Sequence, residues 1–384
     1  MRFKNYCLKD ELIEKFRKEL VSDADELLLN FVFQASHTQE ELDSFLSNWD
    51  ITVVQDHALL MFAYFMKAHN ELVYSEEVKN ITNKLLVAYR FHNLKLISHF
   101  KKIGKALTDE NINILVLKGG AMRAINSENP RLMGDIDALV PVKDYEKSEE
   151  IAKKLGYYVS YSKHSIDLHT DKDSEDGIMD IHKYICMETP NEEAYVEPVF
   201  KRAIHKDVFG IDAFLPSIED MYFITLTNLV RNLANKTSSK NIMFAMYDCV
   251  YLLNLKPDFD WNIVIENAKL TNTTMQICFG TEFLNRIVPN VVPDKIVRTK
   301  ELNKQIEDYA TLVMFNRFYL MNLRATCQEI KIDEAFKSLH SIKEYISLKP
   351  QYFFMKRKGI RKNPKNAGLA IQWLKRRKYG YKYF

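Results

Sequence analysis

The spacing of apolar residues changes twice along the chain and predicts helices on either side of a middle region of strands. Between residues 1 and 107, apolar residues recur three or four positions apart, and neither glycine nor proline occurs before Gly104, so we expect helices. A capping-box pattern beginning at Thr38 predicts one helix start. A longer helix is predicted to end near Thr108, with a stripe at Leu96, Phe100, Ile103 and Leu107. We interpret this region as scaffold or as a surface for a partner, because it carries few convergent polar groups.

Residues 108–215 carry shorter apolar runs, which predict a mixed sheet. The predicted strands are residues 112–117, 136–142, 157–163, 165–170, 178–187 and 208–215. An amphipathic helix is predicted between the second and third strands, because Ser148 and Ala152 share a face and Gly156 can end the helix. The polar segment 171–177 predicts a turn that joins the strands on either side of it into a hairpin.

Residues 216–345 return to helical spacing, and the chain ends in a basic, aromatic segment at 346–384. We therefore expect an α+β or α/β fold class. Its core at 108–215 would be a mixed sheet with flanking helices, placed between an N-terminal helical region at 1–107 and a C-terminal helical region.

The composition is that of an ordinary folded protein. The chain has 384 residues, of which 47% are hydrophobic and 27% charged, and its net charge of +3 gives no overall nucleic-acid signature. The five cysteines include no Cys-x-x-Cys pair, which argues against a disulfide framework or a zinc site. Residues 1–16 lack a signal-peptide core, and the longest apolar run, 58–66, is too short for a transmembrane segment. We expect a cytoplasmic location, with peripheral membrane contact as an alternative.

Residues 115–140 combine two features that chemistry on phosphates requires. A predicted strand runs into Lys118-Gly119-Gly120 and a short helix, and glycines at a helix start let backbone N–H groups approach an anion. Asp135 and Asp137 are one residue apart at the start of the next strand, so both carboxylates point to one face. Two aspartates so placed favour a cation between them. The segment therefore predicts a phosphate site beside a site for Mg²⁺ or Mn²⁺.

Nucleotidyl transfer usually needs three carboxylates for its metal ions, so a third must come from a neighbouring strand. Two Asp-x-His sequences are candidates, one at Asp167 and one at Asp180. We favour Asp180, because it opens a longer apolar stretch typical of a central strand, and such a strand holds a ligand more rigidly than a hairpin end does. His182 lies on the same face as Asp180 and is either a site residue or a satisfied structural histidine.

These motifs follow one another in an order that resembles a known family. The matching residues are Leu117-Lys118-Gly119-Gly120-Ala121, Arg131, Gly134-Asp135-Ile136-Asp137, Gly156-Tyr157 and Met179-Asp180-Ile181-His182. In this order they resemble the uncharacterised bacterial branch of the DNA polymerase β-like nucleotidyltransferase superfamily. The resemblance covers about residues 85–260.

The resemblance implies a Mg²⁺- or Mn²⁺-dependent enzyme that moves NMP from an NTP such as ATP to a hydroxyl or phosphate acceptor and releases pyrophosphate. The implied metal ligands are Asp135, Asp137 and Asp180. Asp180 would also help to activate the acceptor hydroxyl, and Gly119-Gly120 would carry the triphosphate. Many relatives have Gly-Ser at this turn, so this chain lacks one hydroxyl contact and keeps the backbone amides together with Lys118.

The same residues have ordinary structural interpretations. Gly119-Gly120 can be a plain strand-to-helix turn, Lys118 a solvated lysine, and Arg131 a surface ion pair rather than a triphosphate contact. The fold can also serve as a catalytically weak or inactive binding module, such as an antitoxin-like partner. A kinase is a third option, although the chain lacks glycine-loop and catalytic-loop signatures.

The basic segment 346–384 contains no acid and interleaves lysine and arginine with aromatic residues. It is either a solvated terminus, a contact for RNA or a polyphosphorylated acceptor, or a contact for an anionic membrane surface. The nucleotide base and the acceptor, whether small molecule, sugar, peptide or protein, have no readable signal in the sequence.

Overall fold

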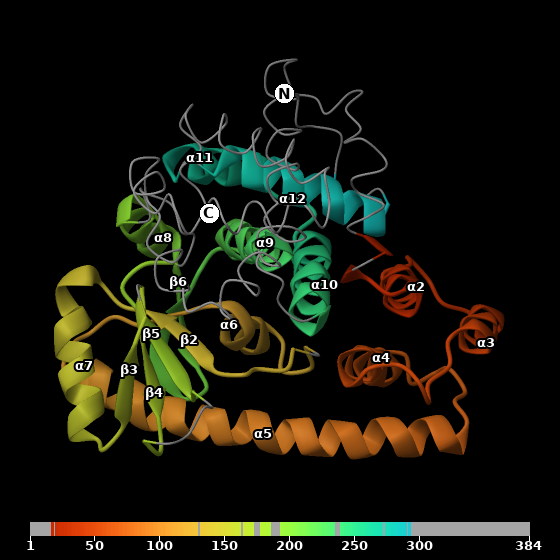
Figure 1. Cartoon of the computed structure of the whole chain (residues 1–384), viewed down its shortest axis with the longest axis horizontal. Helices are drawn as coiled ribbons and strands as arrows, with labels where there is room; N and C mark the ends of the chain where they lie inside the picture. Colours follow the sequence, from red (N-terminus) through yellow and green to blue (C-terminus); the bar gives the residue numbers. More distant parts are fainter. Residues whose placement is uncertain are drawn as a thin grey trace, which may run out of the picture.

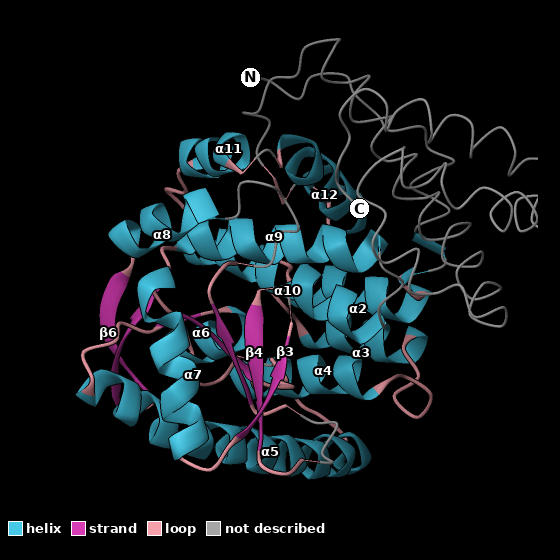
Figure 2. Cartoon of the chain, turned by 60° about the vertical axis from the view of Figure 1, so that its left-hand side comes forward, coloured by secondary structure: helices cyan, strands magenta, loops and turns pink. Residues whose placement is uncertain are grey.

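The protein is built on a mixed seven-stranded sheet surrounded by helices (Figure 1, Figure 2). The computed structural model describes residues 17–292, with gaps at 19, 130, 163, 173–176, 186–192, 235–238, 272 and 290. The sheet has the strand order β3-β4-β5-β2-β1-β7-β6. The predicted fold class is confirmed. The C-terminal part of the predicted helical region and the basic segment 346–384 lie outside the described residues.

All the described strands lie in the middle of the chain, with helices before, between and after them. The strands are β1 (Leu115–Val116), β2 (Ile136–Leu139), β3 (Tyr158–Tyr161), β4 (Ser165–His169), β5 (Met179–His182), β6 (Ile204–Val208) and β7 (Ile211–Leu215). The helices before β1 are α2 (Asp23–Val32), α3 (Gln39–Asn48), α4 (Asp56–Ala68) and α5 (Glu76–Asp109). Within the sheet region they are α6 (Lys118–Ile125), η1 (Val142–Asp144), α7 (Tyr145–Lys154), η2 (Glu193–Tyr195) and α8 (Val196–Arg202). After the sheet they are α9 (Ile218–Ala234), α10 (Ser239–Leu255), α11 (Trp261–Leu270) and α12 (Thr274–Ile287).

Five of the six predicted strands correspond to single strands, and the sixth starts too early. The predicted segment 208–215 contains the whole of β7, but it begins at the last residue of a separate antiparallel strand, β6, and includes the turn at Phe209 and Gly210, whose φ angles are 56° and 87°. The sequence does not reveal β6, because four of its five residues are exposed and a solvated edge strand shows no apolar alternation. The predicted hairpin is present, since β4 and β5 pair antiparallel.

The predicted helix boundaries follow local signals. The Thr38 side chain accepts a hydrogen bond from the Glu41 backbone, and the Glu41 carboxylate accepts one from the Thr38 backbone, which completes the predicted capping box. Helix α7 ends before Gly156, whose φ of 88° is in the left-handed region that glycine accepts without strain. Both boundaries confirm the sequence prediction.

Helix α5 is 34 residues long and runs along one side of the molecule, at the bottom of Figure 1. Its buried positions include the predicted stripe at Leu96, Phe100, Ile103 and Leu107. A Cβ atom on Gly104 would lie 3.1 Å from the Ile211 side chain, so glycine here lets α5 approach β7 closely. The helix ends at Asp109, as expected from the sequence.

A buried polar network joins α8, α9 and α11 on the opposite side of the molecule from α5 (Figure 1). The Arg202 guanidinium donates to both carboxylate oxygens of Asp220, at 2.8 and 2.7 Å. Asp220 also accepts hydrogen bonds from Tyr195 at 2.7 Å, from Asn267 at 2.9 Å and from Ser217 at 2.8 Å. Because the buried carboxylate is fully satisfied, the network fixes these helices rather than weakening the core.

Gly120 is required for packing, and we expect Gly120→Ala to lower the free energy of unfolding by about 1–3 kcal/mol. An added Cβ would lie 2.8 Å from Val116 Cγ1 and 3.3 Å from Ile136 Cγ2, which are side-chain atoms of β1 and β2 that pack against α6. Gly134→Ala is the matched control, because its Cβ would meet nothing within 4 Å. Urea unfolding of both variants checks this, and equal stabilities would contradict the packing role.

None of the described helices combines the length and the apolar composition that crossing a membrane requires. The predicted division of the chain into four regions stays a prediction.

Candidate active site

Three aspartates lie in one row across neighbouring strands. Strands β2 and β5 pair in parallel with Asp137 opposite Asp180, and β5 and β4 pair antiparallel with Asp180 opposite Asp167. Directly opposed residues share a face of the sheet, so all three side chains leave the same face. The sequence treated Asp167 and Asp180 as alternatives. The structure brings both together, with Asp180 in the middle of the row and next to Asp137.

The aspartate row lies on the face of the sheet that α5 does not cover. Val116 is paired with Ala138, and both share the face of Ile114, which lies 3.7 Å from a Cβ placed on Gly104 of α5. Asp137 is adjacent to Ala138 in the strand and therefore points to the other face.

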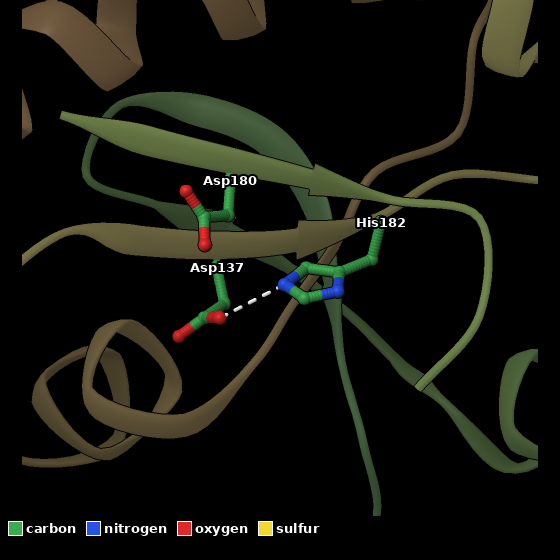
Figure 3. Close-up of side chains that lie close together, drawn as sticks. All are labelled: Asp137, Asp180 and His182. Atoms are coloured by element: carbon green, nitrogen blue, oxygen red, sulfur yellow. Dashed lines mark hydrogen bonds and ion pairs between the residues drawn. The ribbon is translucent and has the colours of Figure 1, made fainter. Parts of the chain in front are cut away.

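Asp137 is the most connected of these carboxylates. Its Oδ1 lies 2.9 Å from His182 Nε2 and 2.5 Å from Lys118 Nζ, and it is buried (Figure 3). One ligand atom each of Asp137, Asp180 and His182 lie within 4.8 Å of one another. The two aspartates and the histidine project from adjacent strands into one space, as Figure 3 shows.

The carboxylates differ in how readily they ionise. Burial and the charges of Asp135, Asp137 and Asp167 raise the pKa of Asp180 to about 8. Burial favours the neutral form of Asp137 as well, but Lys118 and His182 override it and hold the Asp137 pKa below its usual range. Burial lowers the pKa of His182, so its ring is neutral. Nε2 donates to Asp137 when it carries the proton, and in the other tautomer Nε2 is free to bind a metal ion.

This donor set fits a divalent cation. Two carboxylates and a neutral imidazole are ligands that such ions take in proteins, and a cation would relieve the repulsion that raises the Asp180 pKa. When Nε2 binds the ion, the proton of the ring is on Nδ1, which is buried and has no hydrogen-bond partner among the described residues. Asp137, Asp180 and His182 are therefore the side chains that would hold the ion.

Asp135 lies beside this group without being part of it. Its charge contributes to the raised pKa of Asp180, and burial together with Asp137 raises its own pKa to about 6. Among the described residues, the group within 4.8 Å does not include Asp135. Its role as a metal ligand stays a prediction.

The turn before α6 is made by Lys118 rather than by the two glycines. Lys118 has a φ of 46°, whereas the described residues with positive φ do not include Gly119 or Gly120. The glycines serve close packing instead, since a Cβ on Gly119 would lie 3.2 Å from both Arg131 and Met133. A left-handed φ in a non-glycine residue costs free energy. In Lys118 this conformation occurs together with the contact between its Nζ and Asp137. The expectation of a glycine turn is thus corrected, while the helix start remains at the predicted place.

Arg131 crosses the start of α6 and reaches α10. Its Nη1 lies 3.4 Å from Asp248 Oδ2, and its guanidinium stacks 5.1 Å from the centre of the Phe244 ring. Burial raises the pKa of Asp248 to about 6, and Arg131 opposes that shift. Arg131 is therefore a buried ion pair that ties the predicted phosphate turn to α10, and not a surface ion pair.

Arg231 is a candidate that sequence reasoning did not single out. It lies on α9, and its charge opposes protonation of Lys118, whose pKa Asp137 nevertheless holds above the usual value. The sequence offers no signal for it, because Arg231 is a single arginine within an apolar helix stripe. The proximity of Lys118 and Arg231 gives the site positive charge beside the carboxylates.

The chain belongs to a family of uncharacterised nucleotidyltransferases, whose model matches residues 48–289. This confirms the resemblance inferred from the order of the motifs. The solution structure of the antibiotic-resistance factor ANT(2'')-Ia is similar to part of the chain, with 16% identity and a TM-score of 0.34. That likeness covers 46% of this chain and 92% of the other. No curated protein gave a match.

The raised pKa of Asp180 predicts that the metal-free protein loses stability between pH 6.5 and pH 8. In this range the folded state holds a proton that the unfolded state, with an ordinary aspartate, has already released. The free energy of unfolding should therefore fall with pH, by at most about 2 kcal/mol. His182, whose pKa is lowered, costs stability only below about pH 6.5, where the unfolded histidine takes up a proton.

Urea unfolding in the presence of a chelator checks this. The decrease in the free energy of unfolding between pH 6.5 and pH 8 should be smaller in Asp180→Asn. It should be unchanged in Asp258→Asn, since Asp258 is exposed. A fall of the same size in Asp180→Asn would contradict the prediction.

Proposed function

We propose that the protein is a Mg²⁺- or Mn²⁺-dependent nucleotidyltransferase that moves NMP from an NTP to a hydroxyl or phosphate acceptor. The observation that carries this proposal is the group of Asp137, Asp180 and His182, within 4.8 Å of one another and beside Lys118 at the start of α6. Membership of a nucleotidyltransferase family supports it.

The polyphosphate would lie over the start of α6. The first backbone N–H groups of a helix have no partner within the helix and favour an anion. Lys118 and Arg231 add positive charge at this place. The side chain of Arg131 packs against Gly119 and is held by Asp248, so it supports the turn from beneath.

The acceptor would be activated at the carboxylates. A divalent ion held by Asp137, Asp180 and His182 would neutralise phosphate charge and align the acceptor oxygen. With the ion bound, Asp180 would be ionised and could accept the proton of the acceptor hydroxyl. The acceptor oxygen then bonds to the α-phosphorus, the bond from that phosphorus to the bridging oxygen breaks, and pyrophosphate leaves. Asp137 stays ionised and holds Lys118 and His182 in place.

Label transfer from NTPs tests this assignment. The full chain with Mg²⁺ and a small-molecule extract is supplied with each NTP, labelled at either the α- or the γ-phosphorus. The expected result is α-label on an acceptor and γ-label in pyrophosphate. Transfer of γ-label with release of NDP would indicate a kinase. Failure of calorimetry to detect any NTP binding at millimolar concentration would favour the binding module.

A further inference from the structure

The exposed face of α5 is basic and apolar at the same time. From residue 78 to residue 108 this helix contains seven lysine or arginine residues and no aspartate or glutamate. Three of its large hydrophobic side chains are exposed, with fractions of 67% for Val87, 75% for Phe91 and 63% for Leu94. Residues four and three positions apart lie on one side of a helix, so these three form one patch.

Lysines extend this patch in both directions. Lys84, Lys95 and Lys102 lie close to the line through Phe91 at 100° per residue, and all three are exposed. The buried residues of the helix, such as Leu96 and Phe100, lie on the opposite side. The basic–apolar face of α5, residues 84–102, is therefore about 27 Å long and separate from the face that holds the sheet.

Part of the charge on α5 is neutralised and part is not. The cations that have carboxylate partners are Lys79 with Glu76, Arg90 with Glu128 and Lys105 with Asp109. Within the described part of the chain, no carboxylate lies within ion-pair distance of Lys84, Lys95, Lys101 or Lys102. Lys84 and Lys95 flank the three exposed apolar side chains, so the face has uncompensated positive charge beside a hydrophobic centre. Lys102 lies further along the helix, where its Nζ donates to the Leu155 carbonyl at 3.2 Å and lies 5.1 Å from the centre of the Tyr157 ring.

We propose that the basic–apolar face of α5 docks the protein on an anionic lipid surface. Lysines attract the headgroups of anionic lipids, while exposed aliphatic and aromatic side chains gain by entering the boundary between headgroups and acyl chains. A nucleic acid would pair with the lysines equally well, but it offers no apolar phase for Val87 and Leu94. Charge complementarity and the apolar centre together select the lipid surface.

Docking through α5 leaves the candidate active site free. Because α5 covers one face of the sheet and the aspartate row lies on the other, the bilayer and the carboxylates would be on opposite sides of the sheet. Helices α11 and α12, at the top of Figure 1, would point away from the lipid. This inference does not depend on the proposed chemistry.

Co-sedimentation of the full chain with vesicles tests the charge. Binding is expected to vesicles of phosphatidylcholine with phosphatidylglycerol and not to phosphatidylcholine alone. Each lysine near an anionic surface contributes about fivefold, so Lys84→Gln with Lys95→Gln should weaken binding about 25-fold. Lys143→Gln with Lys269→Gln is the matched control, because these lysines are exposed on other elements. Equal binding of the two double variants would overturn the proposal, and would assign any vesicle binding to residues outside α5.

Tryptophan fluorescence tests the apolar centre. Phe91→Trp should give a blue-shifted difference spectrum on adding anionic vesicles, because the indole would enter the lipid boundary. Leu270→Trp, on α11, should give no shift. An unshifted Phe91→Trp spectrum in vesicle-bound protein would overturn the proposal. So would binding of RNA without binding of vesicles. If Lys84→Gln with Lys95→Gln abolished self-association and left vesicle binding unchanged, the proposal would also be overturned. The face would then bind a second copy of the chain.

Discussion

Replacing Asp135 and Asp137 together with asparagine is expected to reduce NMP transfer at least about a thousandfold while the protein stays folded. Lys118 and His182 both contact the carboxylate of Asp137. The negative charge of Asp135 contributes to the raised pKa of Asp180. Asparagine keeps the shape of both side chains but removes the negative charge that would hold a divalent ion. Transfer of α-label from NTP, measured as a rate, gives the effect.

The control for this variant is Asp258→Asn. Asp258 is exposed and far along the chain from the aspartate row, so the same chemical change there should leave the rate unaltered. Circular dichroism establishes that the double variant is folded. Undiminished transfer in a folded double variant would rule out the proposed enzyme.

Asp220→Ala is expected to lower the free energy of unfolding by about 3–5 kcal/mol. The carboxylate accepts hydrogen bonds from Tyr195, Arg202, Ser217 and Asn267, and it is completely buried. Removing it leaves a guanidinium and several donors without their acceptor at the junction of α8, α9 and α11, and such groups cost free energy when they are buried. Urea unfolding followed by circular dichroism measures the change.

Two comparisons make the Asp220 prediction specific. Asp258→Ala removes an exposed carboxylate and should change stability by less than about 0.5 kcal/mol. Tyr195→Phe combined with Asp220→Ala should cost less than the sum of the two single changes, because both act on one network. A loss below about 1 kcal/mol for Asp220→Ala would mean that the network does not hold these helices together.

Local signals account for the parts of the fold that the sequence predicted. The capping box at Thr38, the apolar stripe of α5 and the left-handed Gly156 each depend on residues within one or two helical turns. The start of β2 was also predictable, since apolar and acidic positions alternate at Asp135, Ile136 and Asp137. For the site, the sequence predicted that the Asp180 strand would lie beside β2, and the pairing is as expected.

Other features depend on residues that are distant in the sequence. The role of the glycines could not be read from Lys118-Gly119-Gly120, because it is set by Val116 and Ile136 against Gly120 and by Arg131 against Gly119. β6 was not predicted, because an exposed edge strand needs no alternation of apolar and polar residues. Arg231 carries no local pattern at all, and only the packing of α9 brings it near the site.

The sequence by itself determined the class of fold, the order of the strands from β1 to β5 and the candidate acids, because these follow from periodicity, helix caps and motif order. Only the tertiary structure decided that Asp167 stands beside Asp180, that Lys118 pairs with Asp137 and that Arg131 pairs with Asp248. Strand register and helix packing set those contacts, and both arise from the burial of surfaces that are far apart along the chain.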